Sequence, residues 1–249
     1  MNKVKTVVMI PDLQVPFHDK KALNLVLKYI KDTKVDEVII LGDFMDIFSL
    51  SSHADGRPGQ LENHRIFDEY KQGNKVLDKI QKASKNCKLT YLEGNHEFRV
   101  ERYYDKFPVL RGQLDVDKCL NFKERGIKYV KCYTNGDVYQ LGNAYFHHGL
   151  YINDHHAKKH VSNFGVNIFY GHTHDFQSYS KVLWGEDKTI VGQSLGCLCD
   201  YKQSYVKGNP TSWQLGFGVF YIRPSGFFTY YTPRIFDYKF VAPNGKIYA

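Results

Sequence analysis

The sequence contains no long hydrophobic run and few cysteines, and both deficits limit what the protein can be. No apolar stretch approaches the roughly 20 residues that a membrane-spanning helix needs, so we expect no membrane association. The five cysteines are odd in number and scattered, which suits a reducing cytosol better than a disulfide framework. The first expected strand begins near Val4, which leaves no room for a signal peptide. We therefore expect a cytoplasmic protein.

Two of the cysteines, Cys197 and Cys199, form a Cys-x-Cys pair in a strand-like segment. A lone pair of this kind is more typical of two small residues on one face of a strand than of a zinc site. We therefore assign the pair no metal on sequence grounds.

The remaining composition is that of an ordinary globular protein. The chain has 249 residues, of which 43% are hydrophobic and 24% charged, enough for a sizeable core. Because no linker or internal repeat is visible, we expect a single domain over residues 1–249. The net charge of +8 favours an anionic partner such as nucleic acid or a nucleotide. Because the lysines are dispersed through the chain, a basic surface that serves only solubility remains the alternative.

The first 43 residues predict a β-α-β unit. Residues 4–10 form an apolar run typical of a buried strand, and Asp19 is placed to cap a following helix. A second apolar strand follows at 37–41. Such spacing favours two parallel strands with a right-handed crossover, and ligands of such sheets bind outside the carboxyl ends of the strands. Asp12 and Asp43 both follow strand ends of this kind.

The rest of the chain alternates further helices and strands. We expect short helices and a loop at 108–125, hairpin turns at Asn135-Gly136 and Gly142-Asn143, and a buried stripe on the helix after residue 62 that includes Phe67. The many aromatic residues between 201 and 231 are expected to form the core of a second sheet. The other expected elements are helices at about 62–85, 98–107 and 154–164, and strands at 88–92, 127–133, 138–141, 144–147, 166–170, 180–183, 189–195, 216–222, 227–232 and 236–241.

Polar residues follow five of the expected strands, each directly after the apolar run. They are Asp12-x-Gln14, Gly42-Asp43-x-x-Asp46, Gly94-Asn95-His96-Glu97, His148-Gly149 and Gly171-His172-x-His174. Carboxylates, imidazoles and amide oxygens together suit manganese, iron, zinc or nickel rather than an all-oxygen calcium site. The donors are too many for one ion, so two ions that share a carboxylate are the simplest arrangement. Two ions about 3.5–4 Å apart are typical of enzymes that catalyse displacement at phosphorus.

These five blocks, in order from residue 12 to residue 174, resemble the motifs of the calcineurin-like metallophosphoesterase superfamily. The runs Gly94-Asn95-His96-Glu97-x-Arg99, Gly196-Cys197-Leu198 and Trp213-x-x-Gly216-Phe217 are similar to those of its bacteriophage-type members. The resemblance implies an α/β metallophosphoesterase sandwich of two packed mixed β-sheets flanked by helices. It also implies that the protein acts in the cytoplasm of a phage host.

The resemblance further implies a role for each motif residue. Asp43 would bridge two divalent transition-metal ions, and His96 would contact the scissile phosphate. The other implied ligands are Asp12, Gln14 and His174 for the first ion, and Asn95, His148 and His172 for the second. Most members of the superfamily have histidine where this chain has Gln14. An amide oxygen is a harder and weaker ligand than imidazole, so we expect a looser first site and Mn²⁺ as the preferred ion, with Fe, Zn and Ni as alternatives.

The mechanism we expect is attack of a metal-bound hydroxide on phosphorus. The +8 charge and the basic, aromatic loop at 200–213 favour phosphodiester bonds of nucleic acid or nucleotides as the substrate. The alternatives are a phosphomonoesterase that acts on proteins, nucleic-acid ends or small molecules, and a non-catalytic binding scaffold. Candidate substrate contacts are Arg99, His53, Tyr201 and Lys202, the last two in a basic and aromatic loop at 200–213.

Several assignments stay open at this point. His147 could replace His148 as the ligand, although the family pattern places the ligand directly before glycine. Asp46 is expected to be a hydrogen-bond partner rather than a ligand. Arg99 and Arg102 could face a phosphate or pair with Glu97 and Asp105. His155, His156 and His160 are expected to be solvated on a short polar helix, and His64 shares with His53 the alternatives of substrate contact and plain surface loop.

Overall fold

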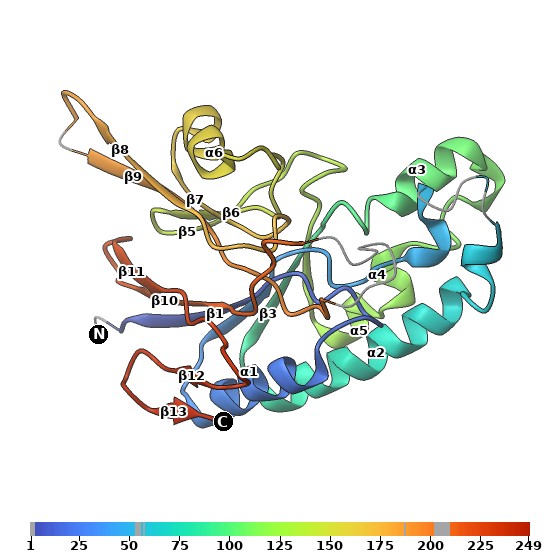
Figure 1. Cartoon of the computed structure of the whole chain (residues 1–249), viewed down its shortest axis with the longest axis horizontal. Coiled ribbons are helices and arrows are strands. Elements are labelled where there is room, and N and C mark those ends of the chain that lie inside the picture. The colour runs from blue at the N-terminus through green and yellow to red at the C-terminus, as the bar shows by residue number, and fades with distance from the viewer. Residues whose placement is uncertain (1–2, 53–55, 57, 187, 202–209) are drawn as a thin grey trace.

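Two mixed β-sheets pack face to face, and helices cover the outer side of each (Figure 1). The computed structural model describes residues 3–52, 56, 58–186, 188–201 and 210–249. This is the α/β sandwich of two packed mixed sheets that the sequence predicted. No helix in these described ranges is long and apolar enough to cross a membrane.

The first sheet has the strand order β11-β10-β1-β2-β3-β4. Strands β1 to β4 run parallel, and β10 and β11 extend the sheet in antiparallel fashion. The strands are β1 (Lys5–Ile10), β2 (Glu37–Ile40), β3 (Lys88–Leu92), β4 (Lys128–Val130), β10 (Gly218–Ile222) and β11 (Phe228–Tyr231).

The second sheet has the order β5-β6-β7-β9-β8, with β6, β7 and β9 parallel. Its strands are β5 (Tyr139–Leu141), β6 (Ala144–Phe146), β7 (Asn167–Tyr170), β8 (Ser178–Leu183) and β9 (Lys188–Ser194). A small hairpin of β12 (Phe240–Val241) and β13 (Ile247–Tyr248) lies beside α1 (Lys20–Asp32).

Helices α1 and α2 (Ile66–Ala83) cover the outer face of the first sheet, and α6 (His156–Phe164) covers the second. Asp19 caps α1 as predicted, since its carboxylate accepts hydrogen bonds from the backbone of Lys21 and Ala22 at 2.9 Å. The remaining helices are α3 (Arg99–Lys106), α4 (Val116–Cys119) and α5 (Phe122–Arg125), with 3₁₀ turns η1 (Phe48–Leu50), η3 (Pro58–Leu61) and η4 (Pro108–Leu110).

The alternation of side chains along β1 explains why the sheets pack in layers. Val8 and Ile10 point to the helix side, whereas Val7 and Met9 point to the other sheet. There they join a core to which the second sheet contributes Phe146 and Phe169, among others. The central parallel strands β2 and β7 are buried along their whole length, which fits their continuous apolar runs.

Three details differ from the prediction. The Asn135-Gly136 segment does not join a hairpin, because β4 pairs with β3 in the first sheet while β5 belongs to the second. The aromatic strands β10 and β11 extend the first sheet rather than forming a second one. Phe67 is 64% exposed, because α2 begins only at residue 66 and a spacing of four places Phe67 on the face of Lys71 and Lys75.

Candidate metal centre

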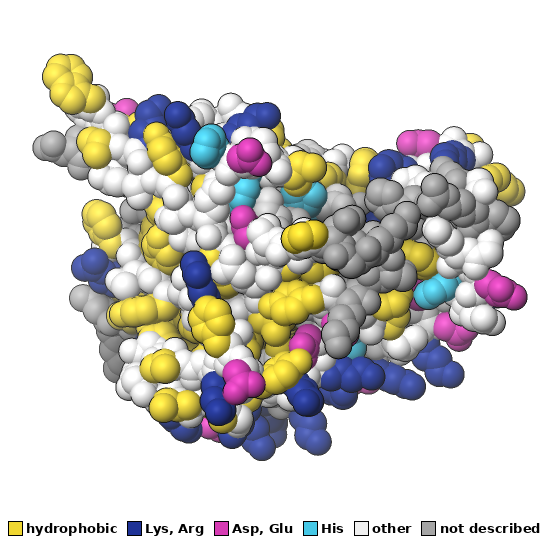
Figure 2. Space-filling model, in the orientation of Figure 1, with side chains coloured by type: hydrophobic (Ala, Val, Ile, Leu, Met, Phe, Trp, Pro, Cys, Tyr) yellow, Lys and Arg dark blue, Asp and Glu magenta, His cyan; other side chains and the backbone are white. Residues whose placement is uncertain are grey.

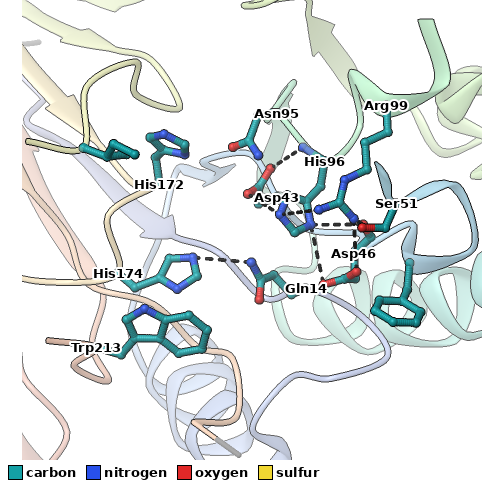
Figure 3. Close-up of a pocket in the computed structure, with 12 residues that line it drawn as sticks. Gln14, Asp43, Asp46, Ser51, Asn95, His96, Arg99, His172, His174 and Trp213 are labelled. Atoms are coloured by element: carbon teal, nitrogen blue, oxygen red, sulfur yellow. Dashed lines mark hydrogen bonds and ion pairs between the residues drawn. The ribbon is translucent and has the colours of Figure 1, made fainter. Parts of the chain in front are cut away.

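All seven predicted ligands lie in loops that follow the carboxyl ends of strands. The loops come from both sheets, so the cluster forms where the two edges meet (Figure 3). The first sheet supplies Asp12 and Gln14 after β1, Asp43 after β2, and Asn95 after β3; the second supplies His148 after β6 and His172 and His174 after β7.

Two groups of potential ligands overlap at Asp43. One group contains Asp43, His148 and His172, the other Asp12, Asp43 and His174, and within each group the donor atoms lie within 4.8 Å of one another. Nε2 of His148 is 3.2 Å from Oδ2 of Asp43, and Nε2 of His174 is 3.2 Å from Oδ1 of Asp12. A single carboxylate common to two ligand groups is the arrangement expected of a two-ion site.

The two amide ligands of the prediction lie beside these groups. Oδ1 of Asn95 is 3.0 Å from Nε2 of His148, and the Gln14 amide is 3.4 Å from Nε2 of His174. Each group thus contains carboxylate, imidazole and amide donors, a mixed set suited to divalent transition-metal ions.

The backbone of the loops is bent to bring the ligands together. Asp12, Gln14, Asp43, His172 and His174 all adopt positive φ angles between 32° and 70°, which is rare for residues other than glycine. Such strain tends to occur where function requires a specific geometry.

Two motif glycines permit the close approach of the carboxylates. A Cβ atom on Gly94 would overlap the carboxylate and backbone nitrogen of Asp43, and one on Gly171 would overlap the carboxylate of Asp12. The backbone N–H of His172 can then donate to both oxygens of Asp12, at 3.0 and 3.1 Å.

The electrostatics of the cluster favour bound positive charge. Burial disfavours the imidazolium form of His148, but Asp43 and Asp12 outweigh this effect and raise the pKa of His148 to about 10. Burial likewise opposes protonation of His174, but Asp12 raises its pKa to about 9. Burial lowers the pKa of His172 to about 3, with a further contribution from His148. The buried carboxylates therefore attract positive charge, which protons or metal ions can supply.

The donors present fit two divalent ions. Asp12, Gln14, Asp43 and His174 could hold one, and Asp43, Asn95, His148 and His172 the other. His147 cannot take the place of His148, because its Nδ1 accepts a hydrogen bond from the backbone of Gly149 and its ring packs against Phe164.

His96 and Arg99 lie on the open side of the cluster, and Asp46 holds both. Nδ1 of His96 is 3.0 Å from the backbone oxygen of Asp46, to which Arg99 also donates at 2.7 Å. Nη2 of Arg99 is 3.1 Å from Nε2 of His96. Asp46 is thus a hydrogen-bond partner, as expected, and Arg99 pairs with Asp46 rather than with Glu97 or Asp105.

Sequence reasoning missed the central role of Glu97. Its buried carboxylate accepts hydrogen bonds from the backbone N–H groups of Asp43, Met45 and Gly94, at 2.8–3.0 Å, and from the hydroxyl of Tyr91 at 2.6 Å. It therefore joins the loop after β2 to the loop after β3. Its position beside His96 in a ligand motif was visible in the sequence, but nothing there indicated which groups it binds.

Asp175 plays the same part for the loop after β7. Its carboxylate accepts hydrogen bonds from the hydroxyls of Thr173 (2.7 Å) and Ser194 (3.0 Å), and lies 3.0 Å from Nε2 of His156. The expectation that His156 and His160 are solvated was wrong. Both are buried, because Tyr170 and Asp175 bind His156 and the backbone of Leu150 donates to His160.

The cluster opens into a cavity of about 390 Å³, within the range of small-molecule sites. Arg99, a predicted substrate contact, lies in its wall together with Phe48, Ile152 and Trp213. The cavity is lined by Gln14, Asp43, Asp46, Phe48, Ser51, Asn95, His96, Arg99, Ile152, His172, His174 and Trp213 (Figure 3).

Tyr201, another predicted substrate contact, is not among the described residues that line the cavity. The hydroxyl of Tyr201 accepts a hydrogen bond from the backbone of Leu215 at 2.7 Å. His53 and Lys202 lie outside the described residues. His64 packs against Phe48, with ring centroids 4.6 Å apart, and so lies behind one side of the cavity.

The chain is similar to known proteins over most of its length. The calcineurin-like phosphoesterase family matches residues 5–176, which include all five site loops. The Gene 54 protein of Mycobacterium phage D29 is 29% identical over 226 residues, covering 86% of this chain and 88% of its own length. That of Mycobacterium phage L5 is 26% identical over 225 residues, with the same coverage. Vacuolar Protein Sorting 29 from Cryptosporidium parvum, a solved structure, is 14% identical, with 95% of this chain and 94% of that chain covered and a TM-score of 0.49.

Proposed function

Because the chain belongs to the calcineurin-like phosphoesterase family, we propose that it is a two-metal phosphodiesterase that acts on nucleic acid or nucleotides in the cytoplasm of a phage host. The family and the phage-type relatives are those that the motifs predicted. The observation that carries the proposal is the sharing of Asp43 by two ligand groups directly beside His96 and Arg99.

Two divalent ions held by these ligands would supply Lewis acidity, which neutralises charge on the phosphoryl group and lowers the pKa of bound water. Mn²⁺ is the ion we expect, because Gln14 and Asn95 add hard amide oxygens to an imidazole-rich set. The chain's own contribution is to hold the seven ligands in place. Glu97 and Asp175 do this by fixing the loops after β2, β3 and β7.

His96 and Arg99 act on the substrate. The guanidinium of Arg99, already fixed by Asp46, donates to the phosphoryl oxygens of the ester in the bidentate manner typical of arginine. Once Arg99 binds the phosphate, Nε2 of His96 is free to carry the proton that the leaving oxygen receives. The carbonyl of Asp46 keeps the imidazole oriented through Nδ1.

A row of lysines supports a polyanionic substrate. Lys71, Lys75 and Lys79 lie at intervals of four on the exposed face of α2. They line a groove together with Lys20, His18 and one carboxylate, that of Asp68. None of these four lysines forms an ion pair with another described residue. Figure 2 shows basic side chains gathered along this edge, over α1 and α2. Unpaired lysines in a row are suited to the phosphates of a nucleic-acid strand.

A pair of packed aromatic rings links the groove to the cavity. Phe17 precedes His18, and its ring packs edge-on against Phe48, with centroids 5.9 Å apart. Phe48 in turn lines the cavity, as does Trp213. Aromatic rings beside a phosphate site can stack on nucleotide bases, so a strand whose phosphates follow the lysines could present a diester to the metal ions.

A metal-supplemented activity screen tests the proposal. Metal-free protein should hydrolyse bis(p-nitrophenyl) phosphate on addition of Mn²⁺, and DNA, RNA or cyclic nucleotides should follow as substrates. Hydrolysis of p-nitrophenyl phosphate alone would indicate a phosphomonoesterase instead. No hydrolysis of any ester with Mn²⁺, Fe²⁺, Zn²⁺ or Ni²⁺ would indicate a binding scaffold and contradict the proposal.

A further inference from the structure

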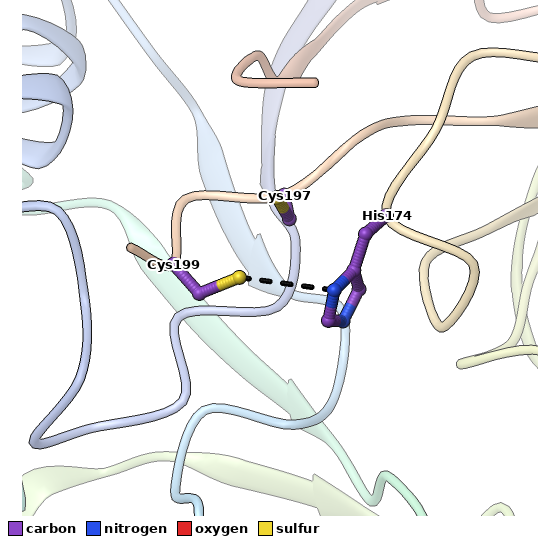
Figure 4. A group of neighbouring side chains, drawn as sticks. All are labelled: His174, Cys197 and Cys199. Atoms are coloured by element: carbon purple, nitrogen blue, oxygen red, sulfur yellow. Dashed lines mark hydrogen bonds between the residues drawn. The ribbon is translucent and has the colours of Figure 1, made fainter. Parts of the chain in front are cut away.

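Two buried thiols converge on the rear of a proposed metal ligand. The segment at 196–199 is fixed on both sides, since Cys197 forms a β-bridge with Leu215 and Cys199 one with His18. Cys197 and Cys199 are two residues apart in an extended segment, so their side chains share a face. Both lie beside His174 (Figure 4), and all three residues are buried.

The spacing of the donor atoms matches that of a thiolate-metal site. Sγ of Cys199 is 3.7 Å from Nδ1 of His174, and the donor atoms of all three residues lie within 4.8 Å of one another. A tetrahedral zinc ion, with Zn–S near 2.3 Å and Zn–N near 2.1 Å, holds sulfur and nitrogen about 3.6 Å apart. The backbone oxygen of Gln214, 3.7 Å from Sγ of Cys197, is a further oxygen donor at the cluster.

The two nitrogen atoms of the His174 ring have different partners. Nε2 faces Asp12 and Gln14, at 3.2 and 3.4 Å, whereas Nδ1 faces Cys199. A neutral imidazole offers one lone pair to a metal, because its other nitrogen carries the proton. When Nδ1 binds an ion, Nε2 is therefore protonated and can only donate to Asp12. As a neutral imidazole, His174 can thus serve the oxygen-rich centre or the thiols, but not both.

We propose that His174, Cys197 and Cys199 form a site for a thiophilic ion such as Zn²⁺, and that its occupation withdraws His174 from the Mn²⁺ centre. Thiolate donors select softer ions than carboxylate and amide donors do. Each thiol releases its proton to solvent as the ion binds. The site would make the enzyme sensitive to the ratio of zinc to manganese. Its inhibitory effect rests on the proposed function, whereas the binding of the ion does not.

Co²⁺ is the probe for binding, because sulfur-to-cobalt charge transfer gives an intense absorption band. Cobalt bound only by oxygen and nitrogen ligands does not show this band. Reduced, metal-free protein titrated with Co²⁺ should develop this band, and its final intensity should correspond to one thiolate-bound Co²⁺ per chain. Cys199→Ser should lose the band, and Cys87→Ser, which alters a thiol that donates to the backbone of Val35 instead, should retain it. Cys197→Ser provides a second variant if Cys199→Ser fails to fold. No band in the wild type, or an undiminished band in either site variant, would overturn the proposal.

Competition is measured separately, by the electron paramagnetic resonance signal of free Mn²⁺. One equivalent of Zn²⁺ added to Mn²⁺-loaded protein should release one Mn²⁺ per chain. In Cys199→Ser the same release should need at least roughly 10–100-fold more Zn²⁺. Loss of a supporting partner lowers the affinity of a metal site by about this factor. If the cobalt–thiolate band formed while both Mn²⁺ ions stayed bound, the proposed competition between the two sites would be wrong. Because neither readout requires turnover, the inference survives or fails independently of the proposed phosphodiesterase activity.

Discussion

Nε2 of His148 lies 3.2 Å from Oδ2 of Asp43, although the two residues belong to loops of different sheets. Asp43 follows β2 of the first sheet and His148 follows β6 of the second. Their contact exists only because the sheets pack through a shared apolar core. The proposed metal centre thus depends on how the two sheets of the sandwich pack against each other.

A variant of His96 should separate catalysis from metal binding. His96→Ala should keep its metal ions, because the imidazole contacts Asp46 and Arg99 rather than completing a ligand group. Its activity should fall by roughly 10²–10⁴-fold if His96 acts as general acid. The loss should be large for an alkoxide leaving group and small for a nitrophenolate, which departs without a proton. Equal losses would instead make His96 an electrostatic clamp, and loss of the metals would contradict the assignment.

Gln14 should set the strength and preference of the first ion site. Gln14→His replaces an amide oxygen with imidazole, so titration should show tighter binding of the first Mn²⁺ and a weaker preference for Mn²⁺ over Zn²⁺. In the unmodified protein Mn²⁺ should support activity better than Mg²⁺, since three imidazoles favour the softer ion. An unchanged affinity in Gln14→His would mean that Gln14 is not a ligand.

The lysine groove should govern nucleic-acid binding without affecting the chemistry. The triple change Lys71→Glu, Lys75→Glu and Lys79→Glu should reduce the slope of log K against log salt by about 2–3, since each lost phosphate contact removes about 0.7–0.9. Hydrolysis of bis(p-nitrophenyl) phosphate should be unchanged. The same charge reversal at exposed Lys158, Lys181 and Lys188, around α6 and the β8–β9 hairpin, is the control. Equal effects of the two triples would show that only net charge matters.

Glu37 should make stability sensitive to acid at the end of β2 opposite Asp43. Burial raises the pKa of this fully buried carboxyl, but Lys5, Tyr139 and Thr90 donate to it at 2.6–2.7 Å and bring the pKa below the ordinary 4.5. Because the folded pKa lies below the unfolded one, the stabilisation is present above pH 4.5 and is lost as pH falls through the folded pKa.

Urea unfolding of metal-free protein measures this contribution. Glu37→Gln should be less stable by roughly 1.5–3 kcal/mol at neutral pH, the range for a hydrogen bond to a charged group, because the hydroxyls of Tyr139 and Thr90 lose their charged acceptor. The difference should shrink below pH 4.5. A difference that stays constant down to pH 3 would contradict the assigned charge.

The local part of this architecture could be predicted from the sequence, whereas its long-range part could not. Apolar strands that end in Asp12, Asp43 and Asn95 define a parallel sheet and its ligand edge by periodicity and spacing alone. The Asn135-Gly136 turn led to a wrong prediction of a hairpin, because a turn signal is local. The assignment of β4 and β5 to different sheets depends instead on their pairing with other strands.

Buried polar residues were the other limit. His156 and His160 look solvated on a polar helix, and only the tertiary structure supplies the partners that allow their burial. Glu97 likewise has partners from β3 and from the loops after β2 and β3. Hydrogen bonds of this kind leave no periodic trace in the sequence.

The manganese content of Asp43→Ala, compared with that of Asp12→Ala, tests the central claim most directly. Wild-type protein dialysed against Mn²⁺ should contain two ions per chain. Asp12→Ala should retain one, because Asp12 belongs to one ligand group, whereas Asp43→Ala should retain none and be inactive, because Asp43 belongs to both. One ion per chain in the wild type, or one ion retained by Asp43→Ala, would contradict a centre built on a shared Asp43.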